Sequence, residues 1–298
     1  MINFGHVVFF EVAKLLSFSR ASETLYISQP SVSKHIKNLE IQYGVALFER
    51  KGSTITLTEE GQIIFKYLSK AVEINNSLEF DISTLKNTAN ARGSLVIGAS
   101  TTVALYLIPK ILSRFHHNYP EIKLRLINRN SENILKALLN HEIDFGIIEG
   151  KNKTTLANYK FFMKDEIVAV CSSTSSLAKK QELPLSELVK IPIALRENGS
   201  GTLAVLATAL EKFDLKLSDL NTQGIIGGTE ALKNFILEFD CICFLPAISV
   251  AKQINNGELV KINFPELKIH REFYFVQRQG EENNKLVKLF IKHANVTI

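Results

Sequence analysis

The chain has 298 residues, of which 46% are hydrophobic and 9% aromatic, a composition typical of a globular protein with sizeable cores. Its formal net charge of +5 indicates an acidic partner. Residues 1–90, however, carry nine basic and nine acidic side chains. An argument for nucleic-acid binding must therefore rest on where the basic side chains lie and not on the net charge. The apolar runs are shorter than the ~20 residues that cross a membrane, and the N-terminus lacks a signal-peptide pattern. We therefore expect a cytoplasmic protein with no membrane partner.

The first 25 residues predict two helices. Apolar side chains follow helical spacing over residues 4–16, from Phe4 to Leu16. Ser19 then offers a hydroxyl that can cap a short second helix carrying Ala21 and Leu25.

A third helix is predicted from Ser28. Ser28 is a favourable N-cap, and Pro30 falls in the first turn, where its missing N–H does no harm. Val32, Ile36 and Leu39 form one apolar stripe that we expect to be buried. The free face then carries a row of polar, small and basic side chains: Gln29, Ser31, Ser33, Lys34 and Lys37. A solvated face is the alternative interpretation, although Glu/Lys pairs are more usual there.

Residues 47–61, LFERKGSTITLTEEG, predict two short strands, around Phe48 and over 55–58, joined by a turn at 51–53. A helix–turn–helix with a small β wing is the result, and we place this all-α winged domain at residues 1–58.

A long helix is predicted next. Thr58 caps it, and Glu59 and Glu60 lie in its first turn, where the helix dipole favours negative charge. Apolar residues recur along it at three- and four-residue steps: Tyr67, Ala71, Ile74, Leu78, Ile82 and Leu85. A helix with such a narrow apolar seam usually packs against the same helix of a second chain. Because the polar stretch 87–93, NTANARG, predicts a hinge, we assign residues 59–90 to a dimerising linker helix and hinge.

Residues 91–298 alternate between strand-like and helix-like runs. Strands are expected at 95–99, 123–128, 145–148, 167–171, 193–195, 241–245, 259–262 and 273–277, with helices between most of them. This alternation predicts an α/β domain with largely parallel sheets. About 200 residues are enough for two lobes with a cleft between them.

Two loops of this region favour an anion site. Ser100, Thr101 and Thr102 follow the strand at 95–99, and Ser200, Gly201 and Thr202 follow the strand at 193–195. Each loop precedes a helix, so each presents hydroxyls and free backbone N–H groups at a positive helix end. Arg196 could add a fixed charge. The alternative is that these residues only cap helices and turn the chain.

Three cysteines, Cys171, Cys241 and Cys243, lack the spacing of a zinc site or a disulfide framework. All lie in apolar strand-like runs, so we expect buried, reduced thiols and no metal site or cofactor. Cys241 and Cys243 are a remote alternative as a redox pair, because residues two apart on a strand face the same side.

The stretch FFEVAKLLSFSRASETLYISQPSVSKHIKNLEIQYGVALFER, followed by LTEEG, resembles the N-terminal domain of the LysR-type transcriptional regulators. Order, spacing and length agree to the end of the chain. The motifs GASTTVALYLIPKIL, DFGIIEG and RENGSGT are most similar to the subgroup of sulfur-assimilation and carbon-fixation regulators. The resemblance implies a winged helix–turn–helix, a long dimerising linker helix and, over residues 91–298, a two-lobed effector domain like the periplasmic binding proteins.

For DNA, the resemblance makes the third helix a recognition helix in the major groove. Gln29 would reach base edges, Ser31 and Ser33 would permit close approach, and Lys34 and Lys37 would contact guanine or phosphate. Arg50 and Lys51 would place positive charge at the wing beside the DNA backbone.

For the effector, the resemblance adds Asn130, Ser131 and Thr229 to the pocket rim, each at a strand-to-helix crossing. We interpret the chain as a sequence-specific DNA-binding transcription regulator, not an enzyme, controlled by a small anionic metabolite. Its expected partners are double-stranded promoter DNA, a second copy in a homodimer or homotetramer, and RNA polymerase as a candidate. A solute-binding protein would leave the first 90 residues unexplained, and an α/β enzyme would need a catalytic set that is not visible at recognisable spacing.

Overall fold

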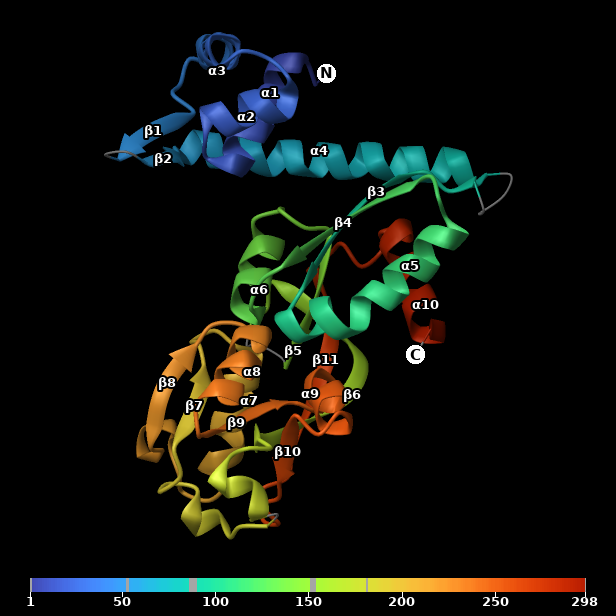
Figure 1. The fold of residues 1–298 in the computed structure, drawn as a ribbon. Coiled ribbons are helices and arrows are strands. Elements are labelled where there is room, and N and C mark those ends of the chain that lie inside the picture. Colours follow the sequence, from blue (N-terminus) through green and yellow to red (C-terminus); the bar gives the residue numbers. More distant parts are fainter. Residues whose placement is uncertain (1, 52–53, 86–89, 151–153, 181, 298) are drawn as a thin grey trace. The chain divides into compact units, whose positions relative to one another are not determined.

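A computed structural model describes residues 2–51, 54–85, 90–150, 154–180 and 182–297. Its contacts divide the chain into two compact units, Met1–Ile82 and Ser83–Ile298 (Figure 1). Each unit has its own apolar core. In the described part of the chain, no helix is long and apolar enough to cross a membrane.

The first unit begins with the three predicted helices, α1 (Phe4–Leu15), α2 (Phe18–Leu25) and α3 (Gln29–Tyr43). Ser28 caps α3 as expected, since its Oγ accepts from the Ser31 N–H at 3.3 Å. The cap of α2 is Ser17 rather than Ser19, because the Ser17 Oγ accepts from the Arg20 N–H at 3.3 Å. The helices enclose a core that includes Val8, Phe9, Val12, Val32, Ile36, Leu39 and Leu47.

The predicted face of α1 is partly wrong. Phe4 and Leu16, expected on the apolar side, are 49% and 47% exposed, whereas His6 is buried. The imidazole of His6 is within hydrogen-bond distance of Asn3 Oδ1 (2.8 Å) and Tyr43 Oη (2.9 Å), so polar contacts take the place of apolar burial at the start of this helix.

The wing and the long helix complete this unit. Strands β1 (Phe48–Lys51) and β2 (Thr54–Leu57) pair antiparallel, and the turn expected between them falls on residues 52–53, which lie outside the described residues. Helix α4 (Glu59–Thr84) begins after Thr58, whose Oγ1 accepts from the Gly61 N–H at 3.0 Å. Gly61 packs so closely on β1 that a Cβ there would lie 2.2 Å from the Leu47 carbonyl oxygen. The wing is therefore fixed to the first turn of α4.

The seam of α4 is uncovered. Its members Tyr67, Ile74, Leu78 and Ile82 are between 55% and 70% exposed, and Leu85, just past the helix, is 81% exposed. The hinge expected at 87–93 is described only from residue 90 onward, because residues 86–89 lie outside the described part.

The second unit is built on a nine-stranded sheet. Eight strands follow the order β4-β3-β5-β11-β6-β9-β7-β8, and the ninth, β10, pairs with β6. The strands are β3 (Gly93–Ala99), β4 (Ile122–Asn128), β5 (Phe145–Glu149), β6 (Ala157–Ser172), β7 (Ile193–Arg196), β8 (Thr222–Ile226), β9 (Ile242–Pro246), β10 (Leu259–Ile262) and β11 (Ile269–Arg278). The expectation of a largely parallel sheet is corrected: β4-β3-β5 and β9-β7-β8 are parallel, but every pairing of β6 or β11 is antiparallel.

Strands β6 and β11 form the ribbon that joins two lobes (Figure 1). Lobe 1 contains β3 to β5 with α5 (Ile108–Asn118), α6 (Ser131–Leu139) and α10 (Lys285–Thr297). Lobe 2 contains β7 to β10 with α7 (Gly201–Glu211), α8 (Thr229–Glu238) and α9 (Ala247–Asn255), and also the short 3-10 turns at Ser176–Lys179, Leu185–Glu187 and Leu217–Asp219. The predicted two-lobed architecture is confirmed.

One helix differs from expectation in its first turns. Residues Val103–Leu107 form a π-helical segment ahead of α5, where a single regular helix was predicted. The wider π turn contains Tyr106, a residue that takes part in a contact between the lobes described below. Such local widening is frequent at functional positions.

Candidate DNA-reading helix and effector cleft

The polar row of α3 lies on the surface of the first unit. Gln29, Lys34 and Lys37 are exposed, and Ser31 and Ser33 are half-buried, while the stripe Val32, Ile36 and Leu39 is buried. The Gln29 Nε2 donates to the Ser33 Oγ at 3.1 Å, so these two side chains already form a polar pair. The side chains of Arg50 and Lys51 lie outside the described residues, so their predicted place beside DNA stays a prediction.

A hollow of about 680 Å³ lies beside this row. Gln29 and Ser33 of α3 form one wall, and the other walls are Leu16–Ser19 at the start of α2 and Thr54–Thr56 of β2. The wing strand and the recognition face therefore border the same depression. Ser17, Ser19 and Thr56 are hydroxyl residues that the sequence did not point to as parts of this surface.

Tyr26 is a second residue that sequence reasoning missed. It closes α2 with φ = 54°, a left-handed conformation that is unusual for a bulky residue, and its side chain is 95% exposed. Tyr26 directly precedes the turn into α3, so an exposed phenol lies close in the chain to the start of that helix. The interruption of the helical pattern at residues 26–28 predicts a turn, but only the structure shows that the side chain of Tyr26 is exposed.

In the second unit, the predicted effector segments follow the carboxyl ends of parallel strands. Ser100 to Thr102 follow β3, Asn130 and Ser131 follow β4, residues 196–202 follow β7, and Thr229 follows β8. In open α/β sheets, ligands bind outside the carboxyl ends of the strands. These segments therefore lie at the edge of the strands where ligand sites of such sheets are found.

The two lobes meet along one side of this region. The Glu132 N–H lies 3.5 Å from the Gly199 carbonyl oxygen, and a Cβ on Gly199 would lie 3.0 Å from Asn130 Nδ2. A Cβ on Gly201 would lie 3.0 Å from Ser131 Oγ. The structure therefore places Asn130 of lobe 1 near Gly199 of lobe 2, and Ser131 of lobe 1 near Gly201 of lobe 2.

A buried charged cluster ties the lobes to the ribbon. Arg271 of β11 donates to Asp165 of β6 at 2.7 and 2.8 Å, and to Glu149 of β5 at 3.2 Å. The same guanidinium donates to Thr202 Oγ1 of lobe 2 at 3.0 Å, and Ser131 of lobe 1 donates to Glu149. Ser131 and Thr202, both predicted to hold the effector, are thus already bonded to this cluster.

Arg196 is also engaged. Its Nε and Nη2 donate to the Glu197 carboxylate at 2.8 and 3.0 Å, and its Nη1 donates to Thr229 Oγ1 at 2.8 Å. Burial works to raise the pKa of Glu197, but the hydrogen bonds and charge of Arg196 outweigh it and leave that pKa below its ordinary value. Arg196 therefore lies where the sequence placed it, with its charge balanced by its neighbour.

The hydroxyls after β3 are in a different state. Ser100 and Thr102 have no exposed surface, and Ser100 Oγ and Thr102 Oγ1 have no hydrogen-bond partner among the described residues. Thr101 is half-buried, and Ser200 is buried without capping its helix through the side chain. Because a buried polar group without a partner is costly, the hydroxyls of Ser100 and Thr102 are groups that would gain from a hydrogen-bond partner.

Tyr106 and Lys233 link the lobes on a second side of the cleft, and the sequence did not point to either. Lys233, 5% exposed, donates to Glu230 at 2.8 Å and lies 3.5 Å from Tyr106 Oη, which itself donates to Glu230. Helical spacing alone makes Lys233 an ordinary surface lysine. Lys233 Nζ also donates to the Ser249 carbonyl oxygen of lobe 2 at 3.4 Å, so both lobes contribute to its burial.

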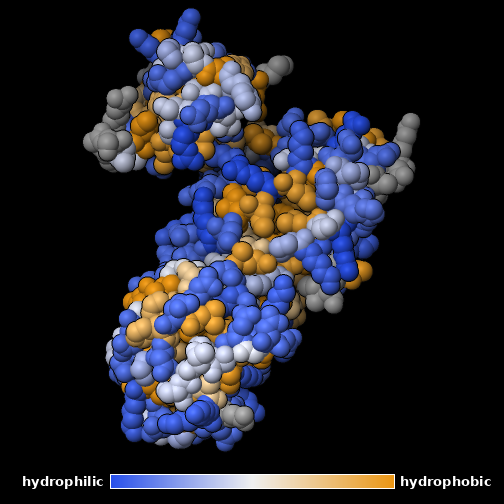
Figure 2. All heavy atoms as spheres, viewed as in Figure 1, coloured by the Kyte–Doolittle hydropathy of each residue, from blue (hydrophilic) through white to orange (hydrophobic). Residues whose placement is uncertain are grey.

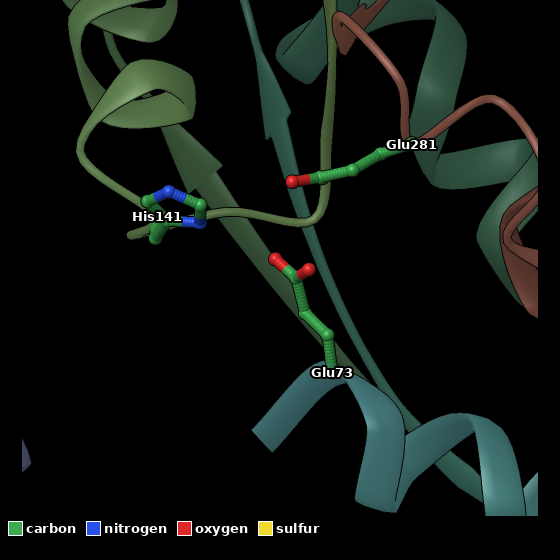
Figure 3. Close-up of side chains that lie close together, drawn as sticks. All are labelled: Glu73, His141 and Glu281. Carbon is green, nitrogen blue, oxygen red and sulfur yellow. The ribbon is translucent and has the colours of Figure 1, made fainter. Parts of the chain in front are cut away.

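No metal site is assigned to the side chains drawn in Figure 3, His141, Glu281 and Glu73. Glu281 already binds Arg278 Nε at 2.5 Å, and Glu73 belongs to the first unit whereas the other two belong to the second.

Family models match both parts of the chain. The LysR substrate binding domain matches residues 88–296, and the bacterial regulatory helix-turn-helix protein, lysR family, matches residues 6–62. A probable RuBisCO transcriptional regulator of Cyanidium caldarium is 27% identical over 278 residues, which is 92% of this chain and 87% of the relative. That name agrees with the predicted likeness to carbon-fixation regulators.

Solved structures share the fold. CbnR, a LysR family transcriptional regulator solved at full length with its target DNA, has 17% identity and a TM-score of 0.66, with 100% of both chains covered. The regulatory domain of CcmR from Synechocystis PCC6803, in complex with 2-PG, has 24% identity and a TM-score of 0.62, covering 68% of this chain and 96% of that domain.

The three cysteines are buried and free, which confirms their predicted state. Burial raises the pKa of Cys171, raises the pKa of Cys241 to about 11 and raises the pKa of Cys243 well above its ordinary value. Because the thiolate is the reactive form, the structure does not favour the alternative of a redox pair at Cys241 and Cys243.

We expect Cys241 and Cys243 to resist iodoacetamide in the native protein at about pH 8, where the thiolate fraction of a group with so high a pKa is small. In urea, all three cysteines should react. Mass spectrometry of the alkylated peptides measures both states. Labelling of Cys241 in the native protein as fast as in urea would contradict the buried, inert assignment.

Proposed function

We infer the function of this chain from its family: the chain belongs to the LysR family of bacterial regulators, with a helix–turn–helix DNA-binding domain followed by an effector-binding domain. It is a DNA-binding transcription regulator, and the matching families are regulators rather than enzymes. The observation that carries the DNA assignment within this chain is the α3 surface, where a buried apolar stripe leaves Gln29, Lys34 and Lys37 exposed beside the half-buried Ser31 and Ser33.

We propose that this row reads promoter DNA in the major groove, in the cytoplasm, where such DNA lies. The Gln29 amide and the Lys34 ammonium can bond to base edges, and Ser31 and Ser33 are short enough to let the helix approach. Tyr26 and the hollow beside β2 would position the DNA backbone rather than read its sequence. RNA polymerase stays a candidate partner of the same complex.

Lys34→Ala and Ser33→Ala should weaken binding to a promoter site by about 1–3 kcal/mol for each lost base contact, because both residues are on the free face of α3. Selection of a site from a random DNA library, followed by fluorescence anisotropy, measures affinity and sequence preference. Lys66→Ala is the matched control, since Lys66 is also exposed but lies on α4. Variants that bind with unchanged affinity and preference would remove α3 from the reading role.

We propose that α4 forms a dimer with the same helix of a second chain. The support is an apolar seam at three- and four-residue steps that is more than half exposed at Tyr67, Ile74, Leu78 and Ile82. Exposed apolar side chains in a heptad-like seam are typical of a two-helix interface. A dimer would also present two recognition helices to two half-sites.

Ile74→Asp with Leu78→Asp should reduce self-association strongly, because both carboxylates would be buried in the interface without a partner. Sedimentation velocity over a range of concentrations measures the change. Asn75→Asp with Ser77→Asp adds the same charge to exposed positions outside the seam and should leave the mass distribution unchanged. Equal masses for both double variants would count against this interface.

We propose that the cleft between the lobes binds a small anionic metabolite. The support is that Ser100 Oγ and Thr102 Oγ1, at a helix start in lobe 1, have no hydrogen-bond partner among the described residues, and that Ser200, Gly201 and Thr202 lie at the start of α7 in lobe 2. The complex of the CcmR regulatory domain with 2-PG agrees with a ligand in this kind of domain. Asn130, Ser131, Arg196 and Thr229 would form the rest of the rim.

The proposed mechanism is a population shift. A ligand that bonds to both lobes stabilises the arrangement in which they lie closest, and it can do so only through its higher affinity for that arrangement. Contacts between the lobes at Glu132 with Gly199 and at Tyr106 with Lys233 would be kept in the arrangement in which the lobes lie closest.

Thr102→Val should affect the free and bound proteins in opposite directions. The free protein should be as stable or more stable, because the substitution keeps the shape and removes a buried hydroxyl without a partner. Binding of the effector should weaken by about 1–3 kcal/mol if that hydroxyl bonds to its charged group. Thermal shift with a panel of carboxylates, phosphate esters and sulfate, followed by calorimetry, measures both effects.

Thr208→Val on α7 is the control for that experiment, since its Oγ1 is exposed and bonds to the Ala204 carbonyl at 3.1 Å. A cationic or neutral effector that binds the Thr102→Val protein as tightly as the unaltered protein would refute the anion site. The two loops would then be ordinary helix caps.

A further inference from the structure

A hollow of about 650 Å³ lies along helix α7 and is lined by residues of both lobes. Three of the predicted effector residues line it, namely Ser131, Ser200 and Gly201, whereas Ser100 and Thr102 of the proposed anion site do not. The predicted residues are therefore divided between two places. Small-molecule sites usually have volumes of ~300–1,000 Å³, so this hollow is large enough for a ligand of its own. We call it the α7 hollow.

One end of the α7 hollow is acidic. Glu149 of β5 is 7% exposed, and its carboxylate accepts from Ser131 Oγ and, at 3.2 Å, from Arg271 Nη1. The same guanidinium also holds the buried Asp165, so two carboxylates share one positive charge. A carboxylate can accept about four hydrogen bonds, which leaves Glu149 able to accept more. This end therefore favours a cationic hydrogen-bond donor over a second anion.

Helix α7 begins directly against this carboxylate. A Cβ on Gly201 would lie 2.8 Å from Glu149 Oε2, so glycine is the residue that allows so close an approach. Ser200, just before it, is 4% exposed and lines the hollow, and its hydroxyl has no hydrogen-bond partner among the described residues. Because such a hydroxyl would gain from a partner, Ser200 indicates that a polar group belongs at this end.

The other end of the hollow is basic. Lys212 follows α7, Lys268 precedes β11, and both are exposed. In the described part of the chain, neither side chain takes part in an ion pair or a hydrogen bond. Lys212 lies about 16 Å beyond Gly201 by the rise of the helix, and Lys268 lies about 16 Å along β11 from the partner position of Glu149. Two elements thus carry free positive charge to the same distance from the acidic end.

Between the two ends the hollow is apolar. Leu203 and Ala207 of α7 and Ile269 of β11 contribute to its wall. Glu132 also lines the hollow, but it is paired with Lys136 at 2.6 Å. On the face drawn in Figure 2, hydrophilic and hydrophobic residues are mixed over the second unit. Along the α7 hollow they instead follow an order, from acidic through apolar to basic.

We propose that the α7 hollow is a second ligand site, which takes an elongated zwitterion. The ammonium group of the ligand bonds to Glu149 and Ser200, an apolar segment lies along α7, and the carboxylate faces Lys212 and Lys268. Short peptides and ω-amino acids share this chemistry. An extended peptide of about four residues spans ~14 Å, and the long lysine side chains cover the remaining distance.

This proposal rests on the effector-binding function proposed for the second unit. A ligand in the α7 hollow contacts lobe 1 at Glu149 and lobe 2 at α7, and Glu149 already belongs to the cluster that joins the lobes through Arg271. Its binding therefore bears on the same arrangement of the lobes as an anion at Ser100 and Thr102.

The first test is calorimetry on the full-length protein with three probes of equal chain length: 8-aminooctanoate, octanoate and octylamine. Octanoate, which lacks the ammonium, should bind about tenfold more weakly than 8-aminooctanoate, because a buried charged hydrogen bond is lost. Octylamine should bind about threefold more weakly, because the lysine end is exposed to solvent. Tetraalanine and N-acetyl-tetraalanine repeat the comparison, and the tighter of the two zwitterions identifies the class of ligand.

The second test places the probe in the hollow. Ala204→Leu fills it from an exposed position of α7 and should abolish binding of 8-aminooctanoate, whereas Ala251→Leu, at an exposed position of α9, is the matched control and should bind normally. Leucine is a good helix former, so both proteins should fold, and their melting temperatures check this.

The third test separates the two ends of the ligand. Lys212→Gln with Lys268→Gln should weaken binding of 8-aminooctanoate but leave octylamine unchanged, since octylamine has no carboxylate. Lys179→Gln with Lys252→Gln removes the same charge from exposed positions outside the hollow and should change neither affinity.

Equal affinities for the three probes, or equal binding by the Ala204→Leu and Ala251→Leu proteins, would overturn the proposal. So would the absence of binding by every zwitterion, even if an anion still binds in a manner sensitive to Thr102→Val. Failure of the anion site appears separately, as the absence of any such Thr102-dependent anion.

Discussion

The guanidinium of Arg271 has no exposed surface and lies at the point where the two lobes and the ribbon meet. It holds Asp165 on the other ribbon strand, Glu149 at the end of β5 and Thr202 at the start of α7. Buried charges are tolerated only when they are paired and fully bonded, and loss of one partner costs about 3–5 kcal/mol. Separating the lobes at this point would remove partners from a buried charge, so the cluster favours arrangements in which these bonds are kept.

This constraint also decides how an effector can act. Ser131 and Thr202 are bonded to the cluster from opposite lobes, so a ligand that reaches either hydroxyl perturbs the bonds that join the lobes. Ser100 and Thr102 carry no such bonds among the described residues. A ligand can bond to Ser100 and Thr102 without breaking hydrogen bonds of the protein. Its contact with Ser131 or Thr202 is the step that couples binding to the arrangement of the lobes.

Features set by local chemistry could be predicted from the sequence. Ser28 and Thr58 cap their helices as expected, because a cap depends on residues three positions apart. The cap of α2 was placed two residues late because Ser17 and Ser19 both offer a hydroxyl, and the backbone conformation at Ser17 decides between them. The stripe of α3 was found because helical spacing and burial coincide there.

Features that depend on distant partners could not be predicted. The first half of β6 and all of β8 were missed, and the antiparallel ribbon was not expected, because strand direction is set by which strands meet across the sheet. Lys233 is buried by contacts with residues distant in the chain, Tyr106 and Ser249, which its position on α8 does not reveal. The sequence predicted Arg196 as a fixed positive charge, and its pairing with the adjacent Glu197 depends on side-chain geometry that the sequence does not give.

The balance of charge in the cleft restricts how an anion can be held. Arg196, Lys233 and Arg271 each face a carboxylate, from Glu197, from Glu230, and from Asp165 and Glu149 respectively. An anionic group therefore meets hydroxyls and the N–H groups of helix starts first, and these can bind it without a free cation. The carboxylate partners of Arg196 and Lys233 are partly exposed, 27% at Glu197 and 47% at Glu230, whereas those of Arg271 are buried. An effector that displaced Glu197 from Arg196 would gain a guanidinium partner in lobe 2 while keeping Ser100 and Thr102 in lobe 1. Such an exchange would give a strong acid an advantage over a neutral analogue of the same shape.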